Sequence, residues 1–337
     1  MLMDIAAIPP GDDAAARSAY DVVERATRAD TPDIPPFGWQ SYRHERGSLP
    51  GRRLERFVAR RGGDVVGVLH LEFPERDNVD TVHVAHLQVD PGHRRSGVGR
   101  ALHAYAVDRA RAAGRTRLTG FLPQATPDGA TTPGAAFATA VGARPARAEA
   151  RHRLEVSDAA AARWETRAAD ARVHADGYRV VHWGLPTPPE LLVDAAYLFT
   201  RTSSDALAGD LTQEAFKADA EQIRQMDESM RVRGRLPYHA GAVHAESGRL
   251  VAWTTLMGRS DVDWHVWQSL TVVAPEHRGH RLGVLVKAEN LRRLRDERPR
   301  VRAVDTYTAE ANHHMNAINV ALGFHPREAW ITVQQTL

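Results

Sequence analysis

The sequence contains no cysteine, and this absence excludes disulfides, thiolate metal ligands and a cysteine nucleophile. Lysine is almost absent as well: Lys217 and Lys287 are the only two, and arginine supplies the rest of the 44 basic residues. No apolar run approaches the roughly 18 to 20 residues that a membrane-spanning helix needs. The N-terminus also lacks the basic region and long apolar stretch of an export signal. We therefore expect a cytoplasmic protein with no membrane partner.

The charges are balanced, with 42 acidic residues and a net charge of +2, and both signs interleave along the chain. A protein that binds nucleic acid concentrates basic residues in a stripe or a tail, so we expect no nucleic-acid partner. The length of 337 residues and the hydrophobic fraction of 43% suit a globular chain with two domains of ordinary size. Both a monomer and a homodimer remain open.

A basic, glycine-containing loop occurs twice in the chain. Residues 87–102 have the pattern of an apolar strand, a proline turn, the loop and a helix that begins near Val98. Residues 270–285 repeat this pattern, with a His-Arg pair one residue after the proline in both copies. Glycines let the backbone approach a ligand, and a helix N-terminus attracts anions, so each loop is a candidate seat for a pyrophosphate.

The predicted seats comprise seven residues of the first copy and six of the second: Arg94, Arg95, Ser96, Gly97, Val98, Gly99 and Arg100, then Arg278, Gly279, His280, Arg281, Leu282 and Gly283. The second copy has Arg281 where the first has Gly97. An arginine still presents its backbone N–H, and its guanidinium can bind phosphate with two hydrogen bonds. Because both copies retain Arg94 and Arg278, we expect their side chains to contact phosphate.

The two halves share one order of expected elements: helices, antiparallel strands, a long strand, the loop, a helix, a strand, a helix and a strand. This order predicts a duplicated α+β unit, each copy with a mixed, mostly antiparallel sheet flanked by helices. We place one module at 1–156, a connecting segment at 157–176 and the second module at 177–337. Within the second module, residues 213–232 are expected to form a helix.

Two motifs carry a resemblance to a known family. Arg94-x-x-Gly97-x-Gly99 lies at a strand-to-helix junction, and the second half adds Asn312-x-x-Met315-x-x-x-Asn319-x-x-x-Gly323-Phe324. These features resemble the GNAT superfamily of acetyl-CoA-dependent N-acetyltransferases. The resemblance covers nearly the whole chain as two tandem modules, in a layout similar to that of mycothiol synthase.

Two other phosphate-binding patterns do not fit. A dinucleotide-binding loop has a third glycine and an acidic residue about 20 residues later, whereas Arg100 and Ala101 follow Gly99. A P-loop requires Gly-Lys-Ser/Thr, and neither lysine lies in that context.

The resemblance implies a splayed long strand whose backbone holds the pantetheine of acetyl-CoA and polarises the acetyl carbonyl. It places this backbone at Gln88 and Val89 in the first copy and at Thr271, Val272 and Val273 in the second. It also places Asn312 and Asn319 beside the coenzyme. The first copy has Thr131 and Ala138 at the positions of these asparagines, so we expect the second copy to be the catalyst.

Transfer to an amine also needs a base and an acid. For the base, the second copy offers His265, Asp263 and Glu310; alternatively, His265 and its neighbouring tryptophans are ordinary sheet residues that pack on helices. The acid in the family is commonly a tyrosine where Asn319 stands here, so Tyr307 is a possible substitute, as are water and direct departure of the thiolate.

In the first copy, His83 and His86 are further candidates for the base. Three residues apart on a strand, they should point to opposite faces, so at most one enters the cleft. The same spacing argues against a metal site, and we expect none.

The resemblance therefore implies an acetyltransferase that moves an acetyl group from acetyl-CoA to an amine of a small molecule. Two alternatives remain open: an enzyme acting on protein or peptide amines, and a catalytically inactive acyl-CoA-binding regulatory protein.

Overall fold

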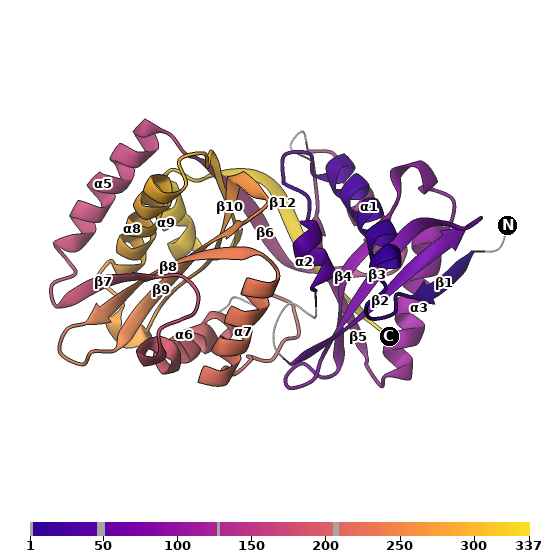
Figure 1. The fold of residues 1–337 in the computed structure, drawn as a ribbon, viewed down its shortest axis with the longest axis horizontal. Coiled ribbons are helices and arrows are strands. Elements are labelled where there is room, and N and C mark those ends of the chain that lie inside the picture. The colour runs from indigo at the N-terminus through magenta and orange to yellow at the C-terminus, as the bar shows by residue number, and fades with distance from the viewer. Residues whose placement is uncertain (1–2, 46–50, 127–128, 205–208) are drawn as a thin grey trace. The chain divides into compact units, whose positions relative to one another are not determined.

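A computed structural model describes residues 3–45, 51–126, 129–204 and 209–337 (Figure 1). The chain forms two compact units, which are described separately. Unit 1 comprises Met1–Ala148, Ala208–Glu214 and Ala329–Leu337. Unit 2 comprises Glu149–Leu207 and Ala215–Glu328.

Unit 1 is built on a sheet with the strand order β1-β2-β3-β4-β5-β12, in which β4 and β5 are parallel and the other neighbours antiparallel. Its strands are β1 (Asp4–Ala7), β2 (Arg52–Arg61), β3 (Asp64–Pro74), β4 (Thr81–Val89), β5 (Arg117–Pro123) and most of β12 (His325–Thr336). Its helices are α1 (Asp13–Asp30), α2 (Trp39–Arg43), α3 (Val98–Ala112) and α4 (Pro133–Ala140).

Unit 2 repeats this topology with the strand order β6-β11-β10-β9-β8-β7, in which β10 and β11 are the parallel pair. Its strands are most of β6 (Arg144–Glu155), then β7 (Tyr178–Trp183), β8 (Arg235–His244), β9 (Leu250–Arg259), β10 (Val262–Val273) and β11 (Ala303–Ala309). Its helices are α5 (Asp158–Arg172), α6 (Leu192–Ser204), α7 (Ala220–Val232), α8 (Leu282–Glu297) and α9 (His313–Leu322). The predicted α+β class and the two tandem modules are confirmed.

Each half of the chain supplies one strand to the sheet of the other half. From β12, Trp330–Thr336 pair with β5 of unit 1, although they are the last strand of the sequence. From β6, Glu149–Glu155 pair with β11 of unit 2. The modules expected at 1–156 and 177–337 did not include this exchange.

Local sequence explains where two of these elements begin and end. The tight turn between β2 and β3 uses Gly62 and Gly63, whose φ angles of 62° and 93° lie in the left-handed region that glycine adopts without strain. The helix expected over 213–232 begins only at Ala220, because Asp219 and Gln222 form a capping box there. Among the described residues, no helix is long and apolar enough to cross a membrane.

The sheet of unit 1 is covered by different helices on its two faces (Figure 1). Phe57 and Leu69 pack with α3 in one buried cluster, and Val58 and Val68 pack with α1 and Tyr42 of α2 in another. Neighbouring strand residues point to opposite faces, so α3 lies on one face and α1 and α2 on the other. The basic loop leads directly into the N-terminus of α3.

Candidate functional site

The parallel strands of each unit separate partway along their length. In unit 1, β4 pairs with β5 from Thr81 to Val84, and in unit 2, β10 pairs with β11 from His265 to Trp267. Beyond these pairs the long strands continue to Val89 and Val273 beside their antiparallel neighbours only, as far as the described residues show. Both units therefore leave one edge of the long strand open just before the basic loop.

The alternation of the strand decides which backbone groups face this opening. The N–H of Asp90 donates to Val66 of β3 (3.0 Å), and the N–H of Ala274 donates to Val251 of β9 (2.8 Å). Residues one position earlier must face the other way, so the N–H groups of Val89 and Val273 point into the opening.

By the same alternation, the N–H groups of Leu87 and Thr271 also face the opening. Of the predicted backbone donors, Val89, Thr271 and Val273 are therefore suitably directed. The predictions for Gln88 and Val272 need correction, because their N–H groups are directed at β3 and β9, respectively.

The two basic loops have matching backbone conformations with the residue types exchanged. In the first loop Arg95 has φ 60° and Gly97 has φ 89°; in the second, Gly279 has φ 89° and Arg281 has φ 54°. Each loop thus has two left-handed positions, one glycine and one arginine. The difference between Gly97 and Arg281 is therefore not a difference in loop shape.

The helices that follow the loops begin without a side-chain cap. Gly97 precedes α3 and Arg281 precedes α8, and neither helix has a side-chain hydrogen bond at its N-cap. A Cβ atom on Gly97 or Gly279 would meet no atom within 4 Å, so the space beside both loops is open. Uncapped N–H groups and the positive end of the helix dipole make each loop suitable for a phosphate.

The recurring arginines have a structural role in both loops. Nε of Arg94 donates to the carbonyl of Val89 and Nε of Arg278 donates to that of Val273, each at 3.3 Å. The guanidinium of Arg94 also forms two hydrogen bonds with the carboxylate of Asp30, at 2.8 and 2.9 Å. These contacts give a structural reason for the retained arginine, and its expected contact with phosphate stays a prediction.

Ser96, also in the first loop, is fixed by hydrogen bonds with His93 and with Arg61 of β2. Its hydroxyl donates to the carbonyl of His93 at 2.6 Å, and Arg61 of β2 donates to its hydroxyl and carbonyl at 3.1 and 3.0 Å. The neighbouring Arg100 and, in the second loop, His280 are solvent-exposed.

The asparagines expected beside the coenzyme make other contacts. Asn319 is fully buried: its Oδ1 accepts a hydrogen bond from Nζ of Lys287 at 2.7 Å, and its Nδ2 donates to Oγ1 of Thr308 at 3.0 Å. Asn312 caps α9 by accepting from the N–H of Met315. The burial and the two contacts of Asn319 contradict its predicted role as a coenzyme ligand, whereas the role of the half-buried Asn312 stays a prediction.

His265 lies inside a buried charge cluster instead of facing an open cleft. It is 3% exposed, and its Nε2 lies 2.9 Å from Oδ2 of Asp305, which also accepts hydrogen bonds from Arg151 (2.8 Å) and Arg153 (2.7 Å). Burial opposes ionisation of Asp305, but the hydrogen bonds from Arg153 and His265 and the charge of Arg151 outweigh it and lower the pKa of this carboxyl. The geometry favours the packing interpretation of His265 over a role as the base.

Tyr307, the candidate acid, lies closer to the opening between the parallel strands than the buried cluster of His265 would allow a base to lie. It lies two residues beyond Asp305, the last residue of β11 that pairs with β10, and its ring stacks on Trp267 with centroids 5.2 Å apart and an interplanar angle of 16°. Burial, together with the carboxylates of Glu328, Asp305 and Glu149, raises the pKa of the half-buried phenol. Tyr307 therefore keeps its proton at neutral pH. Glu310, three residues further on, is exposed.

A β-bulge corrects the expectation for the histidines of the first copy. His86 lies opposite His70, and His83 lies opposite Glu72, because Ala85 is an extra residue in β4. His70 and Glu72 share a face of β3, so His83 and His86 share a face as well. Val82 and Val84 correspondingly pack in the same cluster as Leu87 and Val89. The alternation rule gave the wrong answer here because nothing in the sequence marks the bulge.

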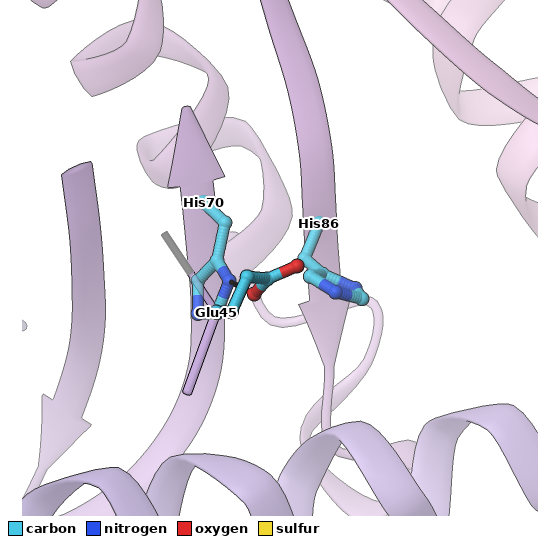
Figure 2. Close-up of side chains that lie close together, drawn as sticks. All are labelled: Glu45, His70 and His86. Carbon is cyan, nitrogen blue, oxygen red and sulfur yellow. Dashed lines mark hydrogen bonds and ion pairs between the residues drawn. The ribbon is translucent and has the colours of Figure 1, made fainter. Parts of the chain in front are cut away.

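The bulge also creates a group that sequence reasoning missed. Glu45, which follows α2, and His70 and His86 from two strands bring their ligand atoms to within 4.8 Å of one another (Figure 2). The three residues are far apart in the sequence and match no spacing motif.

Comparisons with known proteins agree with the geometry. The sequence profile of the Acetyltransferase (GNAT) family matches residues 20–127. The structure is similar to that of a tandem GNAT protein from the clavulanic acid biosynthesis pathway, with 32% sequence identity, coverage of 99% of this chain and 98% of that chain, and a TM-score of 0.82. Among curated proteins, no sequence matches this chain.

A GCN5-related N-acetyltransferase from Sphaerobacter thermophilus shares the fold at 15% identity, with coverage of 99% and 95% and a TM-score of 0.64. The full-length match at 32% identity, the family profile and the duplicated strand–loop–helix corner lead to one conclusion: the chain belongs to the GNAT acetyltransferase family, as one of its tandem two-domain members.

Proposed function

We propose that this chain transfers an acetyl group from acetyl-CoA to an amine of a small molecule, and that both units bind acetyl-CoA. One observation carries the proposal: in each unit, a strand with an open edge runs directly into a loop that ends at an uncapped helix. The loop suits a diphosphate, and the open strand edge offers N–H and C=O groups to the amides of a pantetheine arm.

The transfer itself is assigned to unit 2. The amine nitrogen attacks the thioester carbonyl carbon, and a strand N–H from Thr271 or Val273 stabilises the negative charge that develops on the carbonyl oxygen. The C–S bond then breaks, and the thiolate needs a proton. Tyr307 is placed to supply it, because its phenol lies just beyond the point where β10 and β11 separate, and the phenolate regains its proton from solvent.

The proton of the attacking amine needs a different acceptor. His265 is committed to Asp305 and buried. We assign this role to the exposed carboxylate of Glu310, acting through water.

A small-molecule acceptor is favoured over a peptide by the similarity at 32% identity to a protein named for the clavulanic acid pathway. That comparison also makes a catalytic role more suitable than a purely regulatory one, since a biosynthetic pathway needs catalysts.

The experiment is a measurement of free-thiol release from acetyl-CoA over a panel of small amines and peptides, with the wild-type chain and Tyr307→Phe. We expect release with at least one small amine, and a kcat at least about 10-fold lower for the variant at a similar KM. Thiol release that requires a peptide would contradict the small-molecule acceptor and favour a peptide acceptor. Absence of release with every acceptor would contradict the proposed activity and favour an inactive acyl-CoA-binding protein. Tyr197→Phe, an exposed tyrosine of α6, is the matched control.

A further inference from the structure

We propose that Glu45, His70 and His86 of unit 1 form a binding site for one divalent transition-metal ion of the Zn²⁺ type. Figure 2 shows the Glu45 carboxylate between the two imidazole rings. The carboxylate Oε2 lies 2.9 Å from Nδ1 of His70, and the ring centroids of His70 and His86 are 4.9 Å apart.

The spacing of these atoms suits a metal ion. Zinc–ligand bonds of about 2.0 to 2.2 Å place the ligand atoms of a tetrahedral site roughly 3.3 to 3.6 Å apart. The three ligand atoms here lie within 4.8 Å of one another, so an ion between them needs only small movements of the side chains. Two imidazoles and one carboxylate form a zinc ligand set that leaves a fourth position for water.

The surroundings also suit a metal site. His70 is fully buried, and its second ring nitrogen, Nε2, lies 3.0 Å from the hydroxyl of buried Tyr42. With the Nδ1 lone pair on a metal, Nε2–H donates to this hydroxyl, and such an outer partner fixes the orientation of a ligating imidazole. Phe37 packs against the ring of His86 at 5.7 Å and adds an apolar wall.

The site is specific to unit 1. The bulge at Ala85 has a counterpart at Ser269, after which Leu270 and Thr255 form the pair that corresponds to His86 and His70. Since neither Leu270 nor Thr255 is a histidine, the site is not part of the loop-and-strand arrangement that both units share. It lies on the α1 and α2 face, away from α3.

A metal ion here would tie three separate elements together. Glu45 follows the five-residue helix α2, whereas His70 and His86 belong to β3 and β4. Such a short helix gains little stability from its own hydrogen bonds, and a metal bond would fix its C-terminal end to the sheet. The site would thus order the α2 face of unit 1 independently of the acetyl transfer proposed for unit 2.

The test uses the full chain, freed of metal with a chelator and titrated with Zn²⁺ by calorimetry. Co²⁺ serves as a second probe, because its visible absorption reports the coordination number. Glu45→Gln and His86→Ala remove one ligand each. His83→Asn, on the same strand but hydrogen-bonded to Thr119, and His277→Ala, a loop histidine of unit 2, are the controls.

We expect one ion per chain, a four-coordinate Co²⁺ spectrum, and an affinity at least about 100-fold lower in Glu45→Gln and His86→Ala with both controls unchanged. Circular dichroism of the metal-free variants checks that they are folded, and Glu45→Gln keeps the shape of the side chain in case His86→Ala does not fold. Absence of saturable binding would overturn the proposal. So would wild-type affinity in both ligand variants, or a loss of affinity in His277→Ala alone.

Discussion

The buried Lys287 predicts how the stability of the chain depends on pH, and the structure gives the size of the effect. Its ammonium is buried in α8 at 1% exposure, with the Oδ1 atom of Asn319 at 2.7 Å and the ring of Phe324 at 5.3 Å. Neither group carries a negative charge. Burial lowers the pKa of Lys287 from 10.5 to about 7, which means that charging this side chain costs the folded state free energy.

The lowered pKa of Lys287 determines how much stability the buried charge costs and over which pH range that cost changes. The difference between the unfolded pKa of 10.5 and the folded pKa of about 7 corresponds to about 5 kcal/mol of unfolding free energy. The folded pKa is below the unfolded one, so the unfolded chain binds more protons between the two values. Stability should therefore rise as pH increases from about 7 to about 10.5, and this penalty should be constant below pH 7.

Lys287→Met removes the titrating group and keeps a similar volume. At pH 7, removing the buried charge raises the free energy of unfolding by about 5 kcal/mol. The lost hydrogen bond and the unsatisfied carbonyl of Asn319 together reduce this gain by about 1 to 3 kcal/mol. We expect a net stabilisation of about 2 to 4 kcal/mol at pH 7 that vanishes or reverses near pH 10.5. The assay is urea unfolding at several pH values, with the exposed Lys217→Met as the control. A difference between Lys287→Met and wild type that is the same at every pH would refute the reasoning.

Three further predictions concern the loop and the charge cluster. Gly97→Ala should lower the free energy of unfolding by about 1 kcal/mol, because the φ angle of 89° disfavours any Cβ. Arg281→Gly should raise it slightly, because it removes the same kind of strain. Thermal unfolding of both variants checks this pair of predictions. Arg153→Ala should cost about 3 to 5 kcal/mol by leaving buried Asp305 with less compensation, and an equally stable variant would show that the cluster is dispensable. Folding lowers the pKa of Asp305, so its carboxylate contributes to the free energy of unfolding above its unfolded pKa of about 3.9, and this contribution is lost as pH falls further. Asp305→Asn should therefore flatten the acid limb of the curve of unfolding free energy against pH.

Much of the architecture could be predicted because the signals are local and repeated. The proline turn, the basic loop and the following helix recur in both halves, and each is formed by residues close in sequence. The loop conformation was less accessible, because Arg95 and Arg281 adopt left-handed backbone angles that sequence alone would assign to glycine.

The site residues were harder to predict because their environment comes from distant parts of the chain. His265 is buried by Asp305, Arg151 and Arg153, which belong to strands far away in the sequence. The exchange of β6 and β12 is equally hidden, since the apolar pattern of a strand does not say which sheet it joins. The extra residue at Ala85 reverses the alternation and brings His86 to His70 without any glycine or proline to mark it.

The central claim, that both basic loops are seats for the diphosphate of acetyl-CoA, is tested most directly by counting bound coenzyme. Native mass spectrometry of the full chain at saturating acetyl-CoA should show two molecules per chain, with 3′-dephospho-CoA, which retains the diphosphate, competing for both and pantetheine alone competing poorly. A chain that binds one coenzyme or none at saturation, or that binds pantetheine as tightly as acetyl-CoA, would contradict the account.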